Sequence, residues 1–153
     1  MFERFTKEAR RVVKDAAEIA TELGATTVEA EHLLLAVTRG DTPAAIALRT
    51  WGLDHDALSS ALEMETERSL AAVGVAADVP RFSPYVGSPR LATSAKVALE
   101  HALRVAVERA DRHIGAGHIV LALLKPSRGT LPRALDIAGV QRASLRDAVG
   151  AVT

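Results

Sequence analysis

Cysteine is absent from the 153-residue sequence, so the chain forms neither disulfides nor metal sites built on thiolates. Aromatic residues make up only 3% of it, and we therefore expect a core of closely packed small aliphatic side chains. Lysine plus arginine and aspartate plus glutamate number 19 each, and this balance lacks the basic excess that nonspecific nucleic-acid binding requires. We expect no nucleic-acid partner.

Long hydrophobic runs are missing as well. No apolar segment reaches the roughly 18 residues of a membrane-spanning helix, and the N-terminal residues do not form the apolar region of a signal peptide. These features predict a cytoplasmic protein with no membrane partner. Hydrophobic residues nevertheless make up 48% of the chain, which is enough for one domain with a substantial core.

The sequence does contain an internal repeat. Eight residues of the first half, Ala9, Ala16, Ala20, Glu22, Ala30, His32, Leu35 and Ala36, recur in the same order 86 positions later as Ala95, Ala102, Ala106, Glu108, Ala116, His118, Leu121 and Ala122. After one inserted residue near 125–129 the offset becomes 87, so that Gly52 matches Gly139. A repeat of this length predicts two copies of one structural unit.

Apolar residues recur with helical spacing in both repeats. The first repeat predicts helices from Glu8 to Leu23, from after Thr27 to about Arg39, from Pro43 to Thr50, and from Asp54 or Asp56 to about Thr66. The second predicts helices from Thr93 or Ser94 to about Ala110, from about Ala116 to Leu124, from about Leu131 to Ala138, and from Ser144 to about Val149.

The predicted fold class is therefore all-α, with two four-helix repeats packed as a pseudo-twofold dimer and joined by a surface linker. We predict one domain over 1–153, with the first repeat at 1–66, the linker at 67–90 and the second repeat at 91–150. Within this segment, Ala71 to Pro89 is rich in glycine, proline and serine and has no clear period. Neither repeat buries enough apolar area alone, so each must pack against the other.

Motifs of common enzyme classes are missing. The chain has no G-x-x-x-x-G-K-[ST] phosphate loop, no G-x-S-x-G elbow and no H-E-x-x-H pair. His32 and His118 occupy the same repeat position beside an apolar helix, which favours hydrogen-bonded packing residues over metal ligands. We predict no catalytic residue, no metal and no cofactor. A small metal-dependent hydrolase that uses the histidines is the remote alternative, and a dimerising structural module is another; we expect a monomer.

Glu31, beside Glu29 at the start of a predicted helix, has two interpretations. Acidic residues are common there because they interact favourably with the helix dipole. A carboxylate in this place also suits a cationic group of a ligand. The spacing alone favours the first interpretation.

Three segments, Phe2–Thr6, Ala9–Val13 and Glu31–Ala36, resemble the N-terminal (Clp N, or double-Clp) domain of the ClpC-type unfoldases. The resemblance extends over about Met1 to Val149 and includes both repeats. It implies an all-α pseudo-dimer that docks adaptors and substrates for a hexameric ATP-driven unfoldase. The implied partners are peptides, adaptors or substrates of a Clp protease, and a ClpC-type unfoldase itself. Because the ATPase modules are absent, we expect a free-standing docking module.

The resemblance implies a site for phosphoarginine-tagged substrates at Thr6 and Glu31. The carboxylate would pair with the guanidinium, while the hydroxyl and nearby backbone donors would take the phosphate. The second-repeat equivalents, Ala92 and Gly117, lack both groups, and Glu29 adds a negative charge that opposes a phosphate. Phosphoarginine recognition is therefore the alternative function.

The resemblance also implies an apolar groove between the long first helices of the repeats, which in actinobacterial relatives receives cyclic-peptide antibiotics. The matching positions are Phe2, Val13, Leu91, Lys96, Leu99, Glu100 and Leu103. An apolar floor with charges on its rim is the usual composition of a peptide or small-ligand site, although burial in the core is an equal expectation for Leu99 and Leu103. The leading hypothesis is a non-enzymatic docking module that binds peptides or cyclic-peptide natural products, as an adaptor or as a protective decoy.

Overall fold

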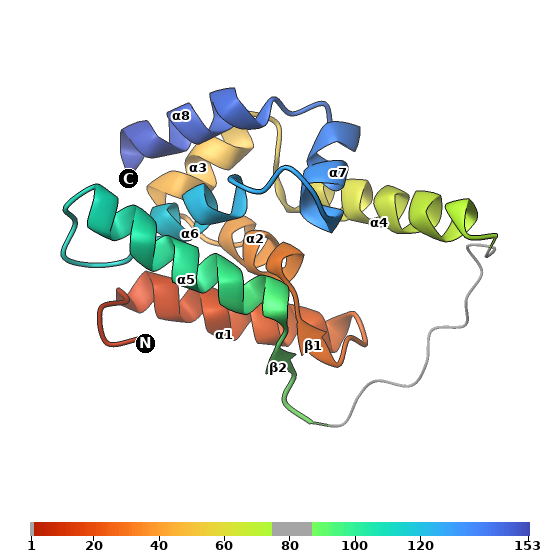
Figure 1. Ribbon diagram of the computed structural model, residues 1–153, viewed down its shortest axis with the longest axis horizontal. Coiled ribbons are helices and arrows are strands. Elements are labelled where there is room, and N and C mark those ends of the chain that lie inside the picture. The colour runs from red at the N-terminus through yellow and green to blue at the C-terminus, as the bar shows by residue number, and fades with distance from the viewer. Residues whose placement is uncertain (1, 75–86) are drawn as a thin grey trace.

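The computed structural model describes residues 2–74 and 87–153, and these form eight helices and two very short strands (Figure 1). The elements are α1 (Lys7–Glu22), β1 (Thr27–Val28), α2 (Ala30–Thr38), α3 (Pro43–Thr50), α4 (His55–Ala72), β2 (Arg90–Leu91), α5 (Thr93–Glu108), α6 (Ala116–Leu123), α7 (Thr130–Ile137) and α8 (Arg142–Val152). The predicted all-α class is confirmed. No helix in the described ranges is long and apolar enough to cross a membrane.

All eight predicted helices are present, and α4 and α8 are longer than expected. Helix α4 continues past Thr66 to Ala72, and the positive φ of Gly74 follows its end. The predicted linker at 67–90 was therefore placed too early at its start, and its residues 75–86 lie outside the described part of the chain. The division into repeats at 1–66 and 91–150 stays a prediction.

Side-chain caps explain where three helices of the first repeat begin. The hydroxyl oxygen of Thr6 accepts a hydrogen bond from the backbone N–H of Ala9 at 3.1 Å, and Thr42 caps α3 in the same way. A carboxylate oxygen of Asp54 accepts from the N–H of Ala57 at 2.8 Å. Such caps satisfy backbone donors that have no partner within the helix.

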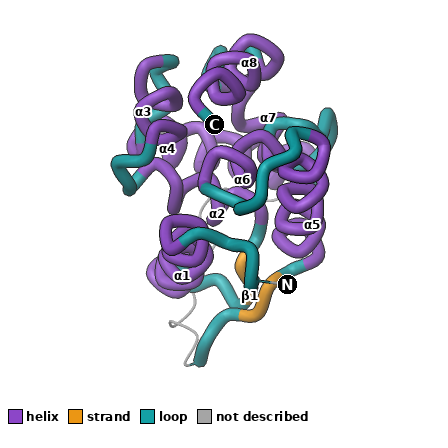
Figure 2. Tube along the Cα trace, turned by 90° about the vertical axis from the view of Figure 1, so that its left-hand side faces the viewer, coloured by secondary structure: helices purple, strands orange, loops and turns teal. Residues whose placement is uncertain are grey.

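The helices form three layers. Helices α2 and α6 lie in the middle of the molecule, with α1 and α5 on one side and α3 and α8 on the other (Figures 1 and 2). Three repeated alanines of α1, Ala9, Ala16 and Ala20, and their counterparts Ala95, Ala102 and Ala106 in α5 are all fully buried. These small side chains let α1 pack closely on α2, and α5 on α6.

The two repeats exchange partners. Strand β1 pairs in parallel with β2, which places Val28 opposite Leu91, and the equivalent positions of the other half, Ile114 and Phe5, form a parallel bridge. Helix α4 packs against α7, and α8 packs against α3. The strand segments and the helices α3, α4, α7 and α8 thus find partners in the other repeat, whereas α1 and α5 pack on helices of their own repeat.

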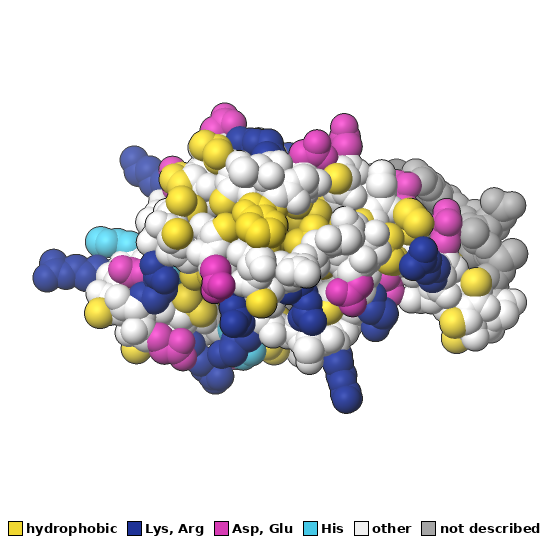
Figure 3. Space-filling model, turned by 90° about the horizontal axis from the view of Figure 1, so that it is seen from above, with side chains coloured by type: hydrophobic (Ala, Val, Ile, Leu, Met, Phe, Trp, Pro, Cys, Tyr) yellow, Lys and Arg dark blue, Asp and Glu magenta, His cyan; other side chains and the backbone are white. Residues whose placement is uncertain are grey.

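One face of the molecule carries an apolar patch. Seen from above, hydrophobic side chains gather near the middle, around the region where α7 and α8 meet the end of α3 (Figure 3). Basic and acidic side chains are interspersed around this patch. The mixture on this face agrees with the zero net charge of the sequence.

Candidate functional site

His32 and His118 both serve as caps inside the fold. The Nδ1 atom of His32 accepts a hydrogen bond from the backbone N–H of Glu29 at 2.9 Å, and Nδ1 of His118 accepts from Gly115 at the same distance. Both residues are 6% exposed, and burial lowers the pKa of His32. The prediction of hydrogen-bonded packing residues is confirmed. Within 2–74 and 87–153, no group of three His, Asp or Glu side chains is placed to hold a metal.

The structure does not bring Thr6 and Glu31 together. Thr6 caps the start of α1, whereas Glu31 lies in the first turn of α2, beyond the other end of α1. The 16 residues of α1 amount to about 24 Å of helix. Because the repeats exchange partners, the N–H of Thr6 donates to the carbonyl of Ile114. Thr6 therefore faces the second repeat.

Ser94, which the sequence analysis did not single out as a site residue, supplies the hydroxyl near the start of α2. Its Oγ accepts a hydrogen bond from the N–H of Ala30 at 3.0 Å and donates to Oε2 of Glu29. Thr27 donates to the other carboxylate oxygen of Glu29 at 3.1 Å. Two hydroxyls thus hold the Glu29 carboxylate in place. Ser94 could have been found only by predicting the exchange of strands between the repeats.

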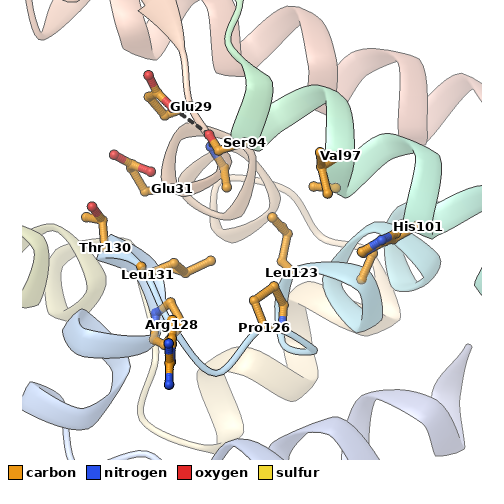
Figure 4. A pocket seen from close by; sticks show the side chains of 15 residues that line it. Glu29, Glu31, Ser94, Val97, His101, Leu123, Pro126, Arg128, Thr130 and Leu131 are labelled. Atoms are coloured by element: carbon orange, nitrogen blue, oxygen red, sulfur yellow. Dashed lines mark hydrogen bonds between the residues drawn. The ribbon is translucent and has the colours of Figure 1, made fainter.

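A pocket of about 520 Å³ lies between the start of α2, the side of α5 and the connection from α6 to α7 (Figure 4). Its apolar lining consists chiefly of Val97, Ala98, Leu123, Pro126 and Leu131. Glu29 and Glu31 line one end of the pocket, and Arg128 lies apart from them on the α6–α7 connection (Figure 4). Nδ1 of His101, another lining residue, is buried without a hydrogen-bond partner among the described residues.

Glu31 is electrostatically the most unusual residue of this pocket. Burial raises the pKa of its carboxyl, and the negative charges of Glu29 and Glu65 act in the same direction, against the lowering effect of a backbone hydrogen bond. No lysine or arginine of the described ranges forms an ion pair with it. A partly buried carboxylate without a counter-ion is suited to receive a cation.

The predicted groove residues differ in their exposure. Phe2 is 37% exposed and packs edge-on against Phe5, with ring centroids 5.0 Å apart. Leu103 is also 37% exposed, whereas Leu99 is fully buried and belongs to the core. The remaining predicted positions are half-buried at Val13 and Leu91 and exposed at Lys96 and Glu100.

Arg10 fixes the backbone that carries Phe2. Its guanidinium donates to the carbonyl oxygen of Phe2 from Nε at 3.3 Å and from Nη2 at 3.2 Å. The N–H of Phe5 donates to the same oxygen at 3.1 Å. Phe2 is thus an exposed aromatic side chain in a defined position.

Comparison with known proteins gives one consistent family. The Clp repeat (R) N-terminal domain model matches residues 4–87 and 90–153. The negative regulator of genetic competence ClpC/MecB of Bacillus subtilis is 30% identical over 150 residues, which are 97% of this chain and 17% of that protein. The chain thus spans less than a fifth of the length of this curated relative.

Solved structures share the fold. The N-terminal domain of the chaperone ClpD from Arabidopsis thaliana superposes with a TM-score of 0.75 at 23% identity, over 99% of this chain and 95% of that one. The ClpV N-domain in complex with a VipB peptide superposes with a TM-score of 0.61 at 17% identity, over 98% and 91%. These likenesses support the arrangement of two repeats described above.

Proposed function

Because the chain belongs to the Clp repeat (R) N-terminal domain family, we propose that it is a non-enzymatic docking module that binds peptides, adaptors or cyclic-peptide natural products. The ClpV N-domain, which has the same fold, has been solved with a VipB peptide bound. We place the ligand of this chain in the groove between the repeats, on Phe2, Val13, Leu91, Lys96, Glu100 and Leu103.

The observation that carries this proposal is the exposed but fixed ring of Phe2. An aromatic side chain that is already ordered loses little conformational entropy on binding and makes a large apolar contact. Leu103 adds an exposed apolar side chain on α5, and Lys96 and Glu100 offer charges on the same helix. Leu99 is not part of this surface because it is fully buried.

The proposed cellular role is that of an adaptor or a protective decoy for a Clp protease system. A decoy binds a toxic ligand and lowers the concentration that reaches a ClpC-type unfoldase. By mass action this works only when the affinity of the decoy rivals that of the unfoldase. The two roles differ in their partners, since an adaptor must also contact the unfoldase.

Calorimetric titration of the purified chain with a cyclic-peptide ligand of ClpC tests the proposal. We expect submicromolar binding, and we expect Phe2→Ala to weaken it roughly 30-fold, because an aromatic anchor contributes about 2 kcal/mol or more. Ile46→Ala is the matched control, since Ile46 is an exposed apolar residue of α3. Equal affinities of the wild type and Phe2→Ala would show that the ligand does not bind in the groove at Phe2.

A further inference from the structure

Helix α1 carries basic residues along its outer face. Four of them, all exposed, line a shallow hollow of about 510 Å³: Lys7, Arg10, Arg11 and Lys14. The last three follow Lys7 by three, four and seven positions, so all four lie on one side of the helix. Helix α1 forms the lower edge of the molecule in Figure 1. We call these four residues the α1 basic stripe.

Ion pairs within α1 leave this stripe positively charged. Nε of Arg11 lies 3.7 Å from Oδ2 of Asp15, and Nζ of Lys14 lies 3.9 Å from Oε1 of Glu18. The two basic side chains are 82% and 77% exposed, and such exposed pairs contribute little to stability. Lys7 forms no ion pair with any residue of 2–74 and 87–153. Its charge is therefore available to a partner.

The charges of α1 are arranged against the dipole of the helix. Cations are favourable near the C-terminus of a helix and unfavourable in its first turn. Lys7 is the first residue of α1, whereas the last turn has no basic residue and the helix ends at Glu22. The basic stripe therefore does not contribute to the stability of α1.

The second repeat has no such stripe. At the offset of 86, the four positions are occupied in α5 by Thr93, Lys96, Val97 and Glu100, which together carry one positive and one negative charge. The fold thus does not require cations at these positions. Basic and acidic residues are also equal in number over the whole chain, so the stripe is a local feature of one helix.

We propose that the α1 basic stripe docks an acidic peptide segment of a protein partner. The guanidinium of Arg11 can bind one carboxylate through two hydrogen bonds, and the two lysines act as point charges on either side. From Lys7 to Lys14 the helix rises about 10 Å, and alternate side chains of an extended peptide are about 7 Å apart. Two acidic residues at alternate positions therefore reach the stripe together.

This surface is separate from the Phe2 groove and adds a second contact to the docking role. Arg10 joins the two surfaces, because its guanidinium contacts the backbone carbonyl of Phe2. A nucleic acid is the less suitable partner, since the chain lacks the basic excess that binding to a phosphate backbone requires.

Fluorescence anisotropy with a short labelled peptide of alternating glutamate and serine tests the α1 basic stripe. We expect saturable binding at about 0.1 M salt that is lost at about 1 M, because the Debye length falls from about 10 Å to about 3 Å. The double variant Lys7→Gln, Arg11→Gln should weaken binding about tenfold, as the loss of a charge-assisted contact predicts. The matched control is Arg104→Gln, which removes an exposed cation from α5.

The thermal midpoint of the double variant should equal or exceed that of the wild type, because a cation in the first turn opposes the helix dipole. A lower midpoint would show that the stripe serves the fold, and would overturn the proposal. So would an absence of saturable binding, equal losses in the double variant and Arg104→Gln, or binding of a single-stranded oligonucleotide as tight as that of the acidic peptide. The cyclic-peptide titration reports on the Phe2 groove, whose residues neither substitution changes. Failure of either proposal therefore leaves the other intact.

Discussion

Arg133 donates a hydrogen bond from Nε to Oε1 of Glu65 at 2.8 Å and so joins α7 of one repeat to α4 of the other. Glu65 is only 4% exposed, and its carboxylate also accepts from the hydroxyl of Ser69 at 2.6 Å. A buried carboxylate needs such partners, because its hydration is lost on folding. This part-buried contact is a polar link between the repeats.

Arg133→Met removes the cation and retains an unbranched aliphatic stem. We expect the free energy of unfolding at pH 7 to fall by about 2 kcal/mol, since Glu65 then has only Ser69 as a partner. The loss should be smaller than for a fully buried pair because the Arg133 side chain is 56% exposed. Urea denaturation measures it, and Arg146→Met on α8 is the control. Equal losses in the two variants would contradict the role assigned to this pair.

His32 makes stability depend on pH. Burial lowers its pKa, and its neutral Nδ1 accepts the N–H of Glu29. Above the ordinary histidine pKa of 6.5, His32 makes its full contribution to the unfolding free energy. This contribution is lost as the pH falls from 6.5 through the lowered pKa, because the unfolded chain takes up the proton first. We expect His32→Gln to remove this component. Denaturation at pH 7.5 and at about pH 5.5 measures it, with the exposed His113→Gln as control. If the unfolding free energy of His32→Gln changed between the two pH values as much as that of the wild type, His32 would not be the source of this pH dependence.

Glu31→Gln should stabilise the protein at neutral pH. Burial and neighbouring carboxylates raise the pKa of Glu31, so the folded state holds its proton more tightly, and the charge destabilises the fold at pH values above that pKa. We expect a gain of up to about 1 kcal/mol in unfolding free energy. Thermal denaturation at pH 7 and pH 4 measures it, and the gain should shrink at the lower pH. A loss of stability at pH 7 would mean that the carboxylate has a structural partner.

Thr6→Ala tests the cap of α1. Removing the hydroxyl leaves the N–H of Ala9 without its acceptor, and we expect a loss of about 1 kcal/mol in unfolding free energy. Asp54→Ala, which removes the cap of α4, should cost a similar amount. Urea denaturation of both variants at pH 7 measures these losses. An unchanged unfolding free energy in Thr6→Ala would contradict the role assigned to this cap.

The helices could be predicted because helix length and apolar spacing are local properties. Helix α3 begins at Pro43 and ends at Thr50 as expected, since proline favours the first turn and the positive φ of Gly52 follows. The end of α4 was missed because its last residues are good helix formers without an apolar period. Helix propensity therefore continues α4 beyond the residues for which the hydrophobic pattern predicted a helix.

The site was harder to predict because it depends on contacts between the repeats. The offset of 86 identifies Phe5 and Leu91 as equivalent residues, but it does not say that each pairs with the other repeat. Because the strand segments of one repeat pair with those of the other, Thr6 lies away from Glu31 and Ser94 lies beside Glu29. Burial of Leu99 likewise depends on tertiary packing, which spacing along α5 leaves undetermined.

The exchange of helices has a consequence for how the protein is made. While the chain emerges from the ribosome, the first repeat is complete before α7 and α8 exist, yet these are the helices that cover α4 and α3. The apolar surfaces of α3 and α4 therefore stay exposed until the second half has been translated. We expect one late, all-or-none folding step for the whole chain, and a nascent first repeat that is itself a ligand for chaperones until that step occurs.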